Sequence, residues 1–182
     1  MPAKKRKPDL LKGKHHKKKS DPLKGKNLIS IGWEDLEYMA AHMARIVKAN
    51  MKPDMIIAIG RGGWIAGRMM SSFFGVTMGS ILARHYTDPG KMREFFIDSR
   101  IVSHKTVKGN IVLVDDVVGT GKTMQEALKL LKRNRKIRKI MTASLYYSTK
   151  SEYKPDVFIK QIRPEDWVVF PYEKEAYEGI KF

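Results

Sequence analysis

The sequence predicts an α/β fold in which a mainly parallel central sheet is flanked by helices. Two stretches carry this prediction, residues 55–74 and 111–132. Each begins with a short run of branched apolar residues, continues through a glycine-containing turn and ends in a helical pattern. Repeated strand–turn–helix units are typical of parallel sheets, because parallel neighbours need a crossover connection. A length of 182 residues is enough for one domain with a proper core.

The composition excludes several classes of protein. The chain has no cysteine, which rules out disulfides and cysteine-based metal sites or nucleophiles. It has no apolar run long enough to span a membrane, and its first residues are basic and lack the apolar core of a secretory signal. We therefore expect no membrane partner and a cytoplasmic location, or a nuclear one if the host is eukaryotic, since the basic run Lys4–Lys7 is compatible with an import signal.

The positive charge is spread unevenly along the chain. The formal net charge is +17, and residues 1–27 carry eleven Lys or Arg against two Asp, a net +9. This segment has no apolar periodicity, so we predict a disordered basic arm at 1–27 and a folded domain at 28–182. Two interpretations of the arm stay open: an arm that binds nucleic acid or a ribonucleoprotein, and a solubilising tail without a specific partner.

The remaining elements follow from apolar periodicity and from turn residues. A short strand is expected at 28–31 and an amphipathic helix at 30–48. Further strands are expected at 76–83, 93–102, 140–147, 157–162 and 167–170. The helix after the central strand ends in seven Lys or Arg between 129 and 139. These cations predict either a solvated helix end that compensates the helix dipole or a basic patch.

The central strand leads into the most informative stretch of the chain. Ile111–Val114 is predicted to be a buried strand, with Asp115 and Asp116 at its C-terminal end, where a turning chain lets both carboxylates reach one crevice. A Gly/Thr loop at 119–123 and a helix from Met124 follow. Backbone N–H groups of such a loop favour an anion, and paired carboxylates suit sugar hydroxyls or Mg²⁺. The inferred ligand is a sugar phosphate with a metal. The alternative is an ordinary turn in which the two acids are solvated and bind no ligand.

A nucleotide-binding P-loop can be excluded at this position. Gly121, Lys122 and Thr123 match the end of that motif, but the motif also needs a glycine five residues before Gly121. Position 116 is an aspartate, so the match fails.

A second turn of similar build follows the predicted strand Met55–Ile59. The turn is Gly60-Arg61-Gly62-Gly63, and a helix is expected at 64–74. Arginine presents a planar fork to pyrophosphate oxygens, and glycines allow backbone N–H groups to approach a ligand. The turn therefore predicts a second anion-binding loop, with a plain turn bearing a surface arginine as the alternative.

These features together resemble a known family. The run Val114-Asp115-Asp116-Val117-Val118-Gly119-Thr120-Gly121-Lys122-Thr123 resembles the diphosphate-sugar signature of type I phosphoribosyltransferases. The resemblance spans about residues 30–175 and implies the type I phosphoribosyltransferase fold with a small C-terminal hood at about 145–175. It implies that phosphoribosyl pyrophosphate is bound by Arg61, Gly62, Gly63, Asp115, Asp116, Gly119, Thr120, Gly121, Lys122 and Thr123. Within this set it implies catalytic roles for Asp115, Asp116 and Arg61, and Mg²⁺ binding by Asp116.

The last part of the chain carries the expected base site. Residues 166–173 look like the hood segment of purine phosphoribosyltransferases of the xanthine–guanine type, which implies that Trp167 stacks on a purine. Two positions depart from the 6-oxopurine pattern: Gly119 stands where an aspartate is usual, and Ser148 where a lysine is usual. Lys150 is the nearest substitute for that lysine. A flexible catalytic loop is implied at 87–94, and His85 precedes it.

The sequence therefore favours a purine phosphoribosyltransferase of the salvage type, using Mg²⁺ and phosphoribosyl pyrophosphate. A 6-oxopurine is the favoured base and adenine the alternative. The resemblance also implies a homo-oligomer, with a dimer as the common form. The competing interpretation is a non-catalytic, nucleotide-sensing protein that binds RNA or a ribonucleoprotein through residues 1–27.

Overall fold

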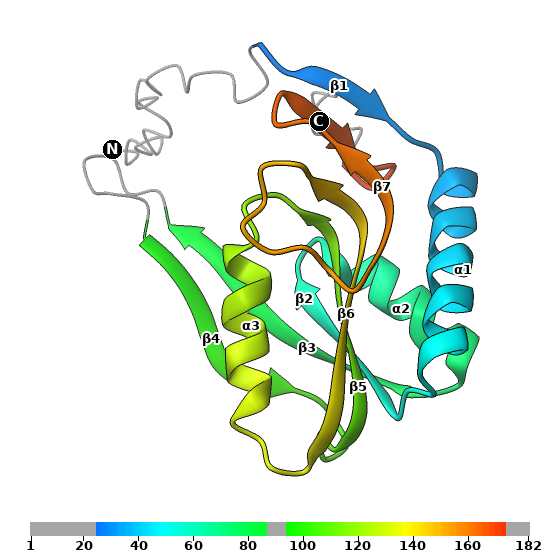
Figure 1. The fold of residues 1–182 in the computed structure, drawn as a ribbon, viewed down its shortest axis with the longest axis vertical. Coiled ribbons are helices and arrows are strands. Elements are labelled where there is room, and N and C mark those ends of the chain that lie inside the picture. Colours follow the sequence, from blue (N-terminus) through cyan, green and yellow to red (C-terminus); the bar gives the residue numbers. More distant parts are fainter. Residues whose placement is uncertain (1–24, 87–93, 174–182) are drawn as a thin grey trace, which may run out of the picture.

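A six-stranded sheet forms the centre of the molecule (Figure 1). The structure is a computed structural model that describes residues 25–86 and 94–173, with the side chains of 84–99 excepted. The strand order is β4-β3-β2-β5-β6-β7, and every neighbouring pair is parallel except β3 with β4. The strands are β2 (Met55–Gly60), β3 (Thr77–Tyr86), β4 (Glu94–Val102), β5 (Gly109–Val118), β6 (Ile137–Ser148) and β7 (Val157–Ile162). The predicted α/β fold with a mainly parallel sheet is confirmed.

Helices cover both faces of this sheet. The helices α1 (Trp33–Asn50) and α2 (Gly63–Phe74) share one apolar core with Val112 and Val114 of β5. The helix α3 (Lys122–Lys132) packs on the other face with Ile111 and Leu113. Successive residues of β5 thus alternate between two cores, as a strand buried on both faces requires. Among the described residues, no helix is long and apolar enough to cross a membrane.

Two predicted boundaries were wrong in a way that affects the site. The strand β5 does not end before the acids but continues to Val118, because β6 runs alongside it and pairs with it as far as Val118 opposite Tyr147. Asp115 and Asp116 therefore lie inside the strand. The helix α3 begins at Lys122 rather than Met124, which places Lys122 and Thr123 in its first turn.

A second, two-stranded sheet joins distant parts of the chain. The strand β1 (Asn27–Ser30) pairs in parallel with β8 (Asp166–Val169). The Asn27 side-chain amide donates a 2.9 Å hydrogen bond to Asp166. This bond and others hold the pKa of the Asp166 carboxyl down at about 2. Within the range 145–175 predicted for the hood, β7 belongs to the main sheet. The strand β8 forms the small sheet with β1, which comes from the N-terminal side of the described chain. Because β1 extends to Ser30, α1 begins at Trp33 and not at the predicted residue 30.

Candidate active site

The two aspartates of β5 lie against the turn that follows β2. These strands are neighbours in the sheet and parallel, so their carboxyl ends meet at one edge. A Cβ added to Gly63 would lie 2.7 Å from the Val114 carbonyl oxygen, and one added to Gly62 would collide with the Asp116 carboxylate. Glycine at both positions therefore allows the turn to contact the acid pair directly. The structure thus brings together two stretches that the sequence singled out separately.

The acid pair concentrates negative charge in a poorly hydrated place. Asp115 is only 8% exposed. Burial raises the pKa of its carboxyl well above the usual range, and the charge of Asp116 raises it further. Desolvation also raises the pKa of Asp116, against the hydrogen bonds that it accepts. Within residues 25–86 and 94–173, neither acid belongs to an ion pair. A bound cation or hydroxyl donor would relieve this charge.

A third segment completes the surroundings of Asp116. The Tyr172 hydroxyl donates a 3.0 Å hydrogen bond to Asp116 Oδ2 and lies 3.4 Å from the Gly62 carbonyl oxygen. The Tyr172 ring stacks on Phe170 with centroids 5.2 Å apart. Burial and the charge of Asp116 raise the pKa of the Tyr172 phenol, so it stays a donor at physiological pH. Sequence reasoning assigned no role to Tyr172; its only signal was its place in the segment 166–173.

The neighbouring Glu173 belongs to the same cluster. Burial raises the pKa of its carboxyl, as does the charge of Asp116, whereas the guanidinium of Arg61 opposes this shift. Arg61 itself is exposed in the turn after β2, and the peptide bond between Gly60 and Arg61 is cis. The C-terminal segment, the β2–α2 turn and β5 thus meet at one place.

Replacing Tyr172 by phenylalanine should weaken the contact between the C-terminal segment and β5. The Tyr172→Phe variant keeps the ring stacked on Phe170 but removes the donor from a partly buried carboxylate, so the free energy of unfolding should fall by about 1–2 kcal/mol. Urea denaturation measures this change. Tyr38 is 66% exposed and provides the control, because Tyr38→Phe should leave the stability unchanged. Equal stability of wild type and Tyr172→Phe would show that the hydrogen bond contributes nothing.

The turn after β6 contacts the loop at 119–123. The Glu152 N–H donates to the Thr120 carbonyl oxygen at 3.0 Å. Gly121 has φ +85°, in the left-handed region, and a Cβ there would lie 2.6 Å from Ser151 Oγ. Gly119 faces open space. Because α3 starts at Lys122, the N–H groups of its first turn lie at this loop, which favours an anion.

The residues predicted for the base lie at two separate elements. Trp167 is on β8 opposite Leu28, and its indole N–H is buried without a hydrogen-bond partner in the described part of the chain. Lys150 is exposed in the turn after β6, and its backbone N–H lies 3.4 Å from the Ser148 hydroxyl. The His85 side chain, most of the predicted loop at 87–94 and residues 1–24 of the basic arm lie outside the described residues.

The donor set at the acid pair fits Mg²⁺. Mg²⁺ prefers carboxylate oxygens together with water and phosphate oxygens, and one or two protein carboxylates suffice. The described residues contain no cluster of three or more His, Cys, Asp or Glu that would form an all-protein site. Asp115 and Asp116 therefore suit a metal whose other ligands come from substrate and water.

Comparisons with known proteins agree with this geometry. The family model "Phosphoribosyl transferase domain" matches residues 33–178. A hypoxanthine-guanine phosphoribosyltransferase of Schizosaccharomyces pombe is 25% identical over 183 residues, covering 80% of this chain and 89% of that protein.

Two solved structures have a similar fold. A purine phosphoribosyltransferase from Pyrococcus horikoshii has a TM-score of 0.68 and 26% identity, covering 80% of this chain and 93% of that one. A Helicobacter pylori xanthine-guanine-hypoxanthine phosphoribosyltransferase has a TM-score of 0.72 and 23% identity, covering 84% and 97%. The chain therefore belongs to the phosphoribosyl transferase domain family, and is an enzyme of the glycosyltransferase type.

Proposed function

We propose that the protein transfers the 5-phosphoribosyl group from phosphoribosyl pyrophosphate to a purine base and releases pyrophosphate, as a salvage enzyme. The observation that carries this proposal is the acid pair of β5 in direct contact with the turn Gly60–Gly63 and followed by the loop 119–123. Family membership supports the reaction type, and purine enzymes among the relatives support the class of base.

The proposed reaction breaks the bond between the ribose C1′ and pyrophosphate and forms a bond from C1′ to a purine nitrogen, which loses its proton. Positive charge develops on the ribose between these events. The carboxylates of Asp115 and Asp116 accept hydrogen bonds from the ribose hydroxyls and stabilise that charge in a site with little water. No protein nucleophile is needed. Catalysis rests on positioning and electrostatics.

Two loops bind the phosphates of the substrate in this proposal. Arg61 and the N–H groups of Gly62 and Gly63 bind the leaving pyrophosphate, while Gly119, Thr120, Gly121, Lys122 and Thr123 bind the 5′-phosphate. Mg²⁺, held through Asp116, would neutralise pyrophosphate charge when bound. The acid pair contacts the first loop, and the second loop follows the end of the same strand; both facts support this assignment, because the ribose connects the two phosphate groups of the substrate.

A 6-oxopurine is the proposed base, with Trp167 as its stacking platform and Lys150 as its polar contact. The relatives that act on hypoxanthine, guanine or xanthine support this choice. Gly119 supplies no carboxylate for a base nitrogen, and Ser148 is only 6% exposed, so the base is read by fewer polar side chains than the family pattern implies. Adenine stays the alternative. A homo-dimer and a nucleic-acid partner for residues 1–27 stay predictions.

A turnover assay tests the proposal. The full chain with Mg²⁺ and phosphoribosyl pyrophosphate is incubated separately with guanine, hypoxanthine, xanthine and adenine, and nucleotide formation is followed by chromatography. Product is expected from at least one 6-oxopurine. Product from adenine alone would correct the base. No product from any base, with phosphoribosyl pyrophosphate still bound, would contradict the transfer reaction and favour a nucleotide-sensing role.

A further inference from the structure

We infer that the edge of the main sheet opposite the active site binds the phosphate backbone of a nucleic acid. We call this surface the basic edge and define it as residues 51–54, 103–110 and 132–139. These three segments lie at the N-terminal ends of β2, β5 and β6, whereas the acid pair lies near the carboxyl end of β5. Figure 1 shows the connection from α3 to β6 at the opposite end of the molecule from the small β1–β8 sheet.

Hydrogen bonds hold the three segments side by side. The Asp54 N–H donates to the Asn110 carbonyl oxygen at 2.8 Å, and the Gly109 N–H to the Lys136 carbonyl oxygen at 2.9 Å. The Asn134 side-chain amide donates to the Val107 carbonyl oxygen at 2.9 Å. The strand order β2-β5-β6 makes these segments neighbours in space although they are far apart in the sequence. The basic edge is therefore one continuous surface.

This surface carries an extreme charge. Its nine cationic side chains are all exposed: Lys52, Lys105, Lys108, Lys132, Arg133, Arg135, Lys136, Arg138 and Lys139. Asp54 is the single acid of the three segments. Its carboxylate is already engaged by Arg138 at 2.8 Å and by the Asn110 N–H at 2.7 Å, contacts that lower its pKa. In the described part of the chain, Lys105 and Lys108 make no ion pair.

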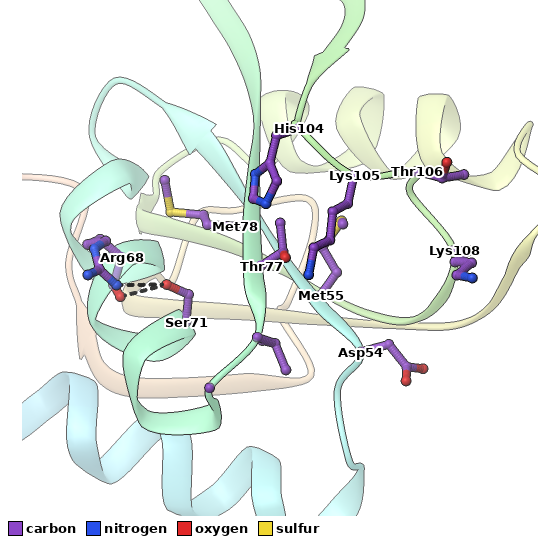
Figure 2. A pocket seen from close by; sticks show the side chains of 12 residues that line it. Asp54, Met55, Arg68, Ser71, Thr77, Met78, His104, Lys105, Thr106 and Lys108 are labelled. Carbon is purple, nitrogen blue, oxygen red and sulfur yellow. Dashed lines mark hydrogen bonds between the residues drawn. The ribbon is translucent and has the colours of Figure 1, made fainter.

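A groove of about 1020 Å³ adjoins this surface (Figure 2). Arg68 of α2 lies on one side, and His104 and Lys105 lie on the other. The Arg68 guanidinium is held by hydrogen bonds to the hydroxyls of Ser71 and Ser72, so this donor is fixed before any ligand arrives. Lys108 lines the same groove and extends it towards the cations of residues 132–139. The groove thus adds donors for phosphate oxygens to a surface of matching charge.

A polyanion with regular charge spacing fits this surface better than a small anion. The starts of three neighbouring strands span about 10 Å, a length over which a nucleic-acid duplex presents about six phosphates. An anionic membrane is a weaker match, because basic membrane surfaces usually carry apolar anchors. The large hydrophobic side chains exposed in the described residues are Leu28, Trp33, Tyr38, Trp64, Phe73 and Val102, and all lie outside the basic edge.

Charge-neutralising variants of the full chain test the inference. The edge variant is Lys105→Gln/Lys108→Gln/Arg135→Gln. The control is Arg45→Gln/Lys48→Gln/Lys160→Gln, which removes the same charge from exposed positions on α1 and β7. Binding to a fluorescein-labelled 20-base-pair duplex, as DNA and as RNA, is followed by anisotropy between 50 and 200 mM salt. The edge variant should bind at least about tenfold more weakly, with a salt slope smaller by about 3, and the control should stay within about threefold of wild type.

Each other outcome overturns the inference. Equal losses in both variants would mean that only net charge matters, and unchanged binding in both would leave residues 1–27 as the contact. Loss of binding to vesicles containing phosphatidylserine, with duplex binding kept, would assign the edge to membranes. A second edge variant, Lys52→Gln/Lys132→Gln/Lys136→Gln, should repeat the loss if one variant folds poorly. Nucleotide formation should be unchanged in both edge variants, so failure of the proposed enzyme activity would be seen separately.

Discussion

The Asp115→Asn/Asp116→Asn variant should lose at least about 10³-fold of its phosphoribosyl transfer while unfolding at a higher temperature than wild type. The loss is expected because the variant lacks both carboxylates proposed to stabilise the ribose charge, including that of Asp116, the proposed contact of Mg²⁺. The gain in stability is expected because two neighbouring carboxylates, with raised pKa values, no longer have to be buried in charged form.

The sign of the stability change depends on pH. A carboxyl whose pKa is higher in the folded chain than in the unfolded one favours folding when it is protonated. The cost of burying the charge therefore grows as the pH rises from the unfolded pKa of about 4 to the raised folded pKa, and it is constant above that. At pH 7.5 the double variant should melt at a higher temperature than wild type. At pH 3.5 the difference should vanish.

Differential scanning fluorimetry measures both parts of this prediction. Mg²⁺ with phosphoribosyl pyrophosphate should raise the melting temperature of wild type but not that of the variant, because ligand binding stabilises only a chain that binds. The control is Glu37→Gln, which removes the charge of an exposed carboxylate on α1. It should change neither the melting temperature nor its increase on adding the ligands. A double variant that keeps turnover would remove the acid pair from the proposed site.

Gly62→Ala should lower turnover by about 100-fold or more, although alanine suits the backbone there. Gly62 has φ −55° and ψ −48°, which is ordinary right-handed helical geometry. The obstacle is steric, because the added Cβ would collide with the Asp116 carboxylate. Either the turn or the carboxylate has to move, and a shift of about 1 Å in a positioning group costs about 10²-fold in rate. Overpacking should also cost about 1–3 kcal/mol of stability.

A double-mutant cycle separates this contact from a general disturbance. In an Asp116→Ala background the carboxylate is absent, so Gly62→Ala should cost little stability. Gly119→Ala is the matched control, because its Cβ meets nothing within 4 Å and its φ lies outside the left-handed region. It should leave the melting temperature unchanged. If Gly62→Ala were equally costly with and without the Asp116 carboxylate, the proposed steric conflict would be wrong.

The local parts of the fold could be predicted from the sequence, because dense apolar runs and glycine turns are local signals. The strand at 157–162 was predicted to the residue, and the β2–α2 unit to within one residue at each boundary. Long-range pairing was not predictable in the same way. The extension of β5 through Asp115 and Asp116 depends on the length of β6, and the β1–β8 pair joins residues 139 positions apart.

The site shows the same division. The family resemblance assigned both turns to one substrate, but the contact of Gly62 with Asp116 depends on the pairing of β2 with β5, which was not predicted. Tyr172 was missed because its role arises only when the C-terminal segment returns to β5, and one tyrosine beside a glutamate gives no local signal of that return.

The small β1–β8 sheet makes the candidate active site depend on both ends of the described chain. Tyr172 follows β8 by three residues, and within residues 25–86 and 94–173 β8 pairs only with β1. During synthesis the acid pair is therefore made well before its last neighbour, and the site is complete only after residue 172 has been added and has found a strand from the beginning of the chain. A chain that begins at Asn27 should therefore keep this arrangement, whereas a chain that begins after Ser30 lacks β1, the strand that pairs with β8 just before Tyr172.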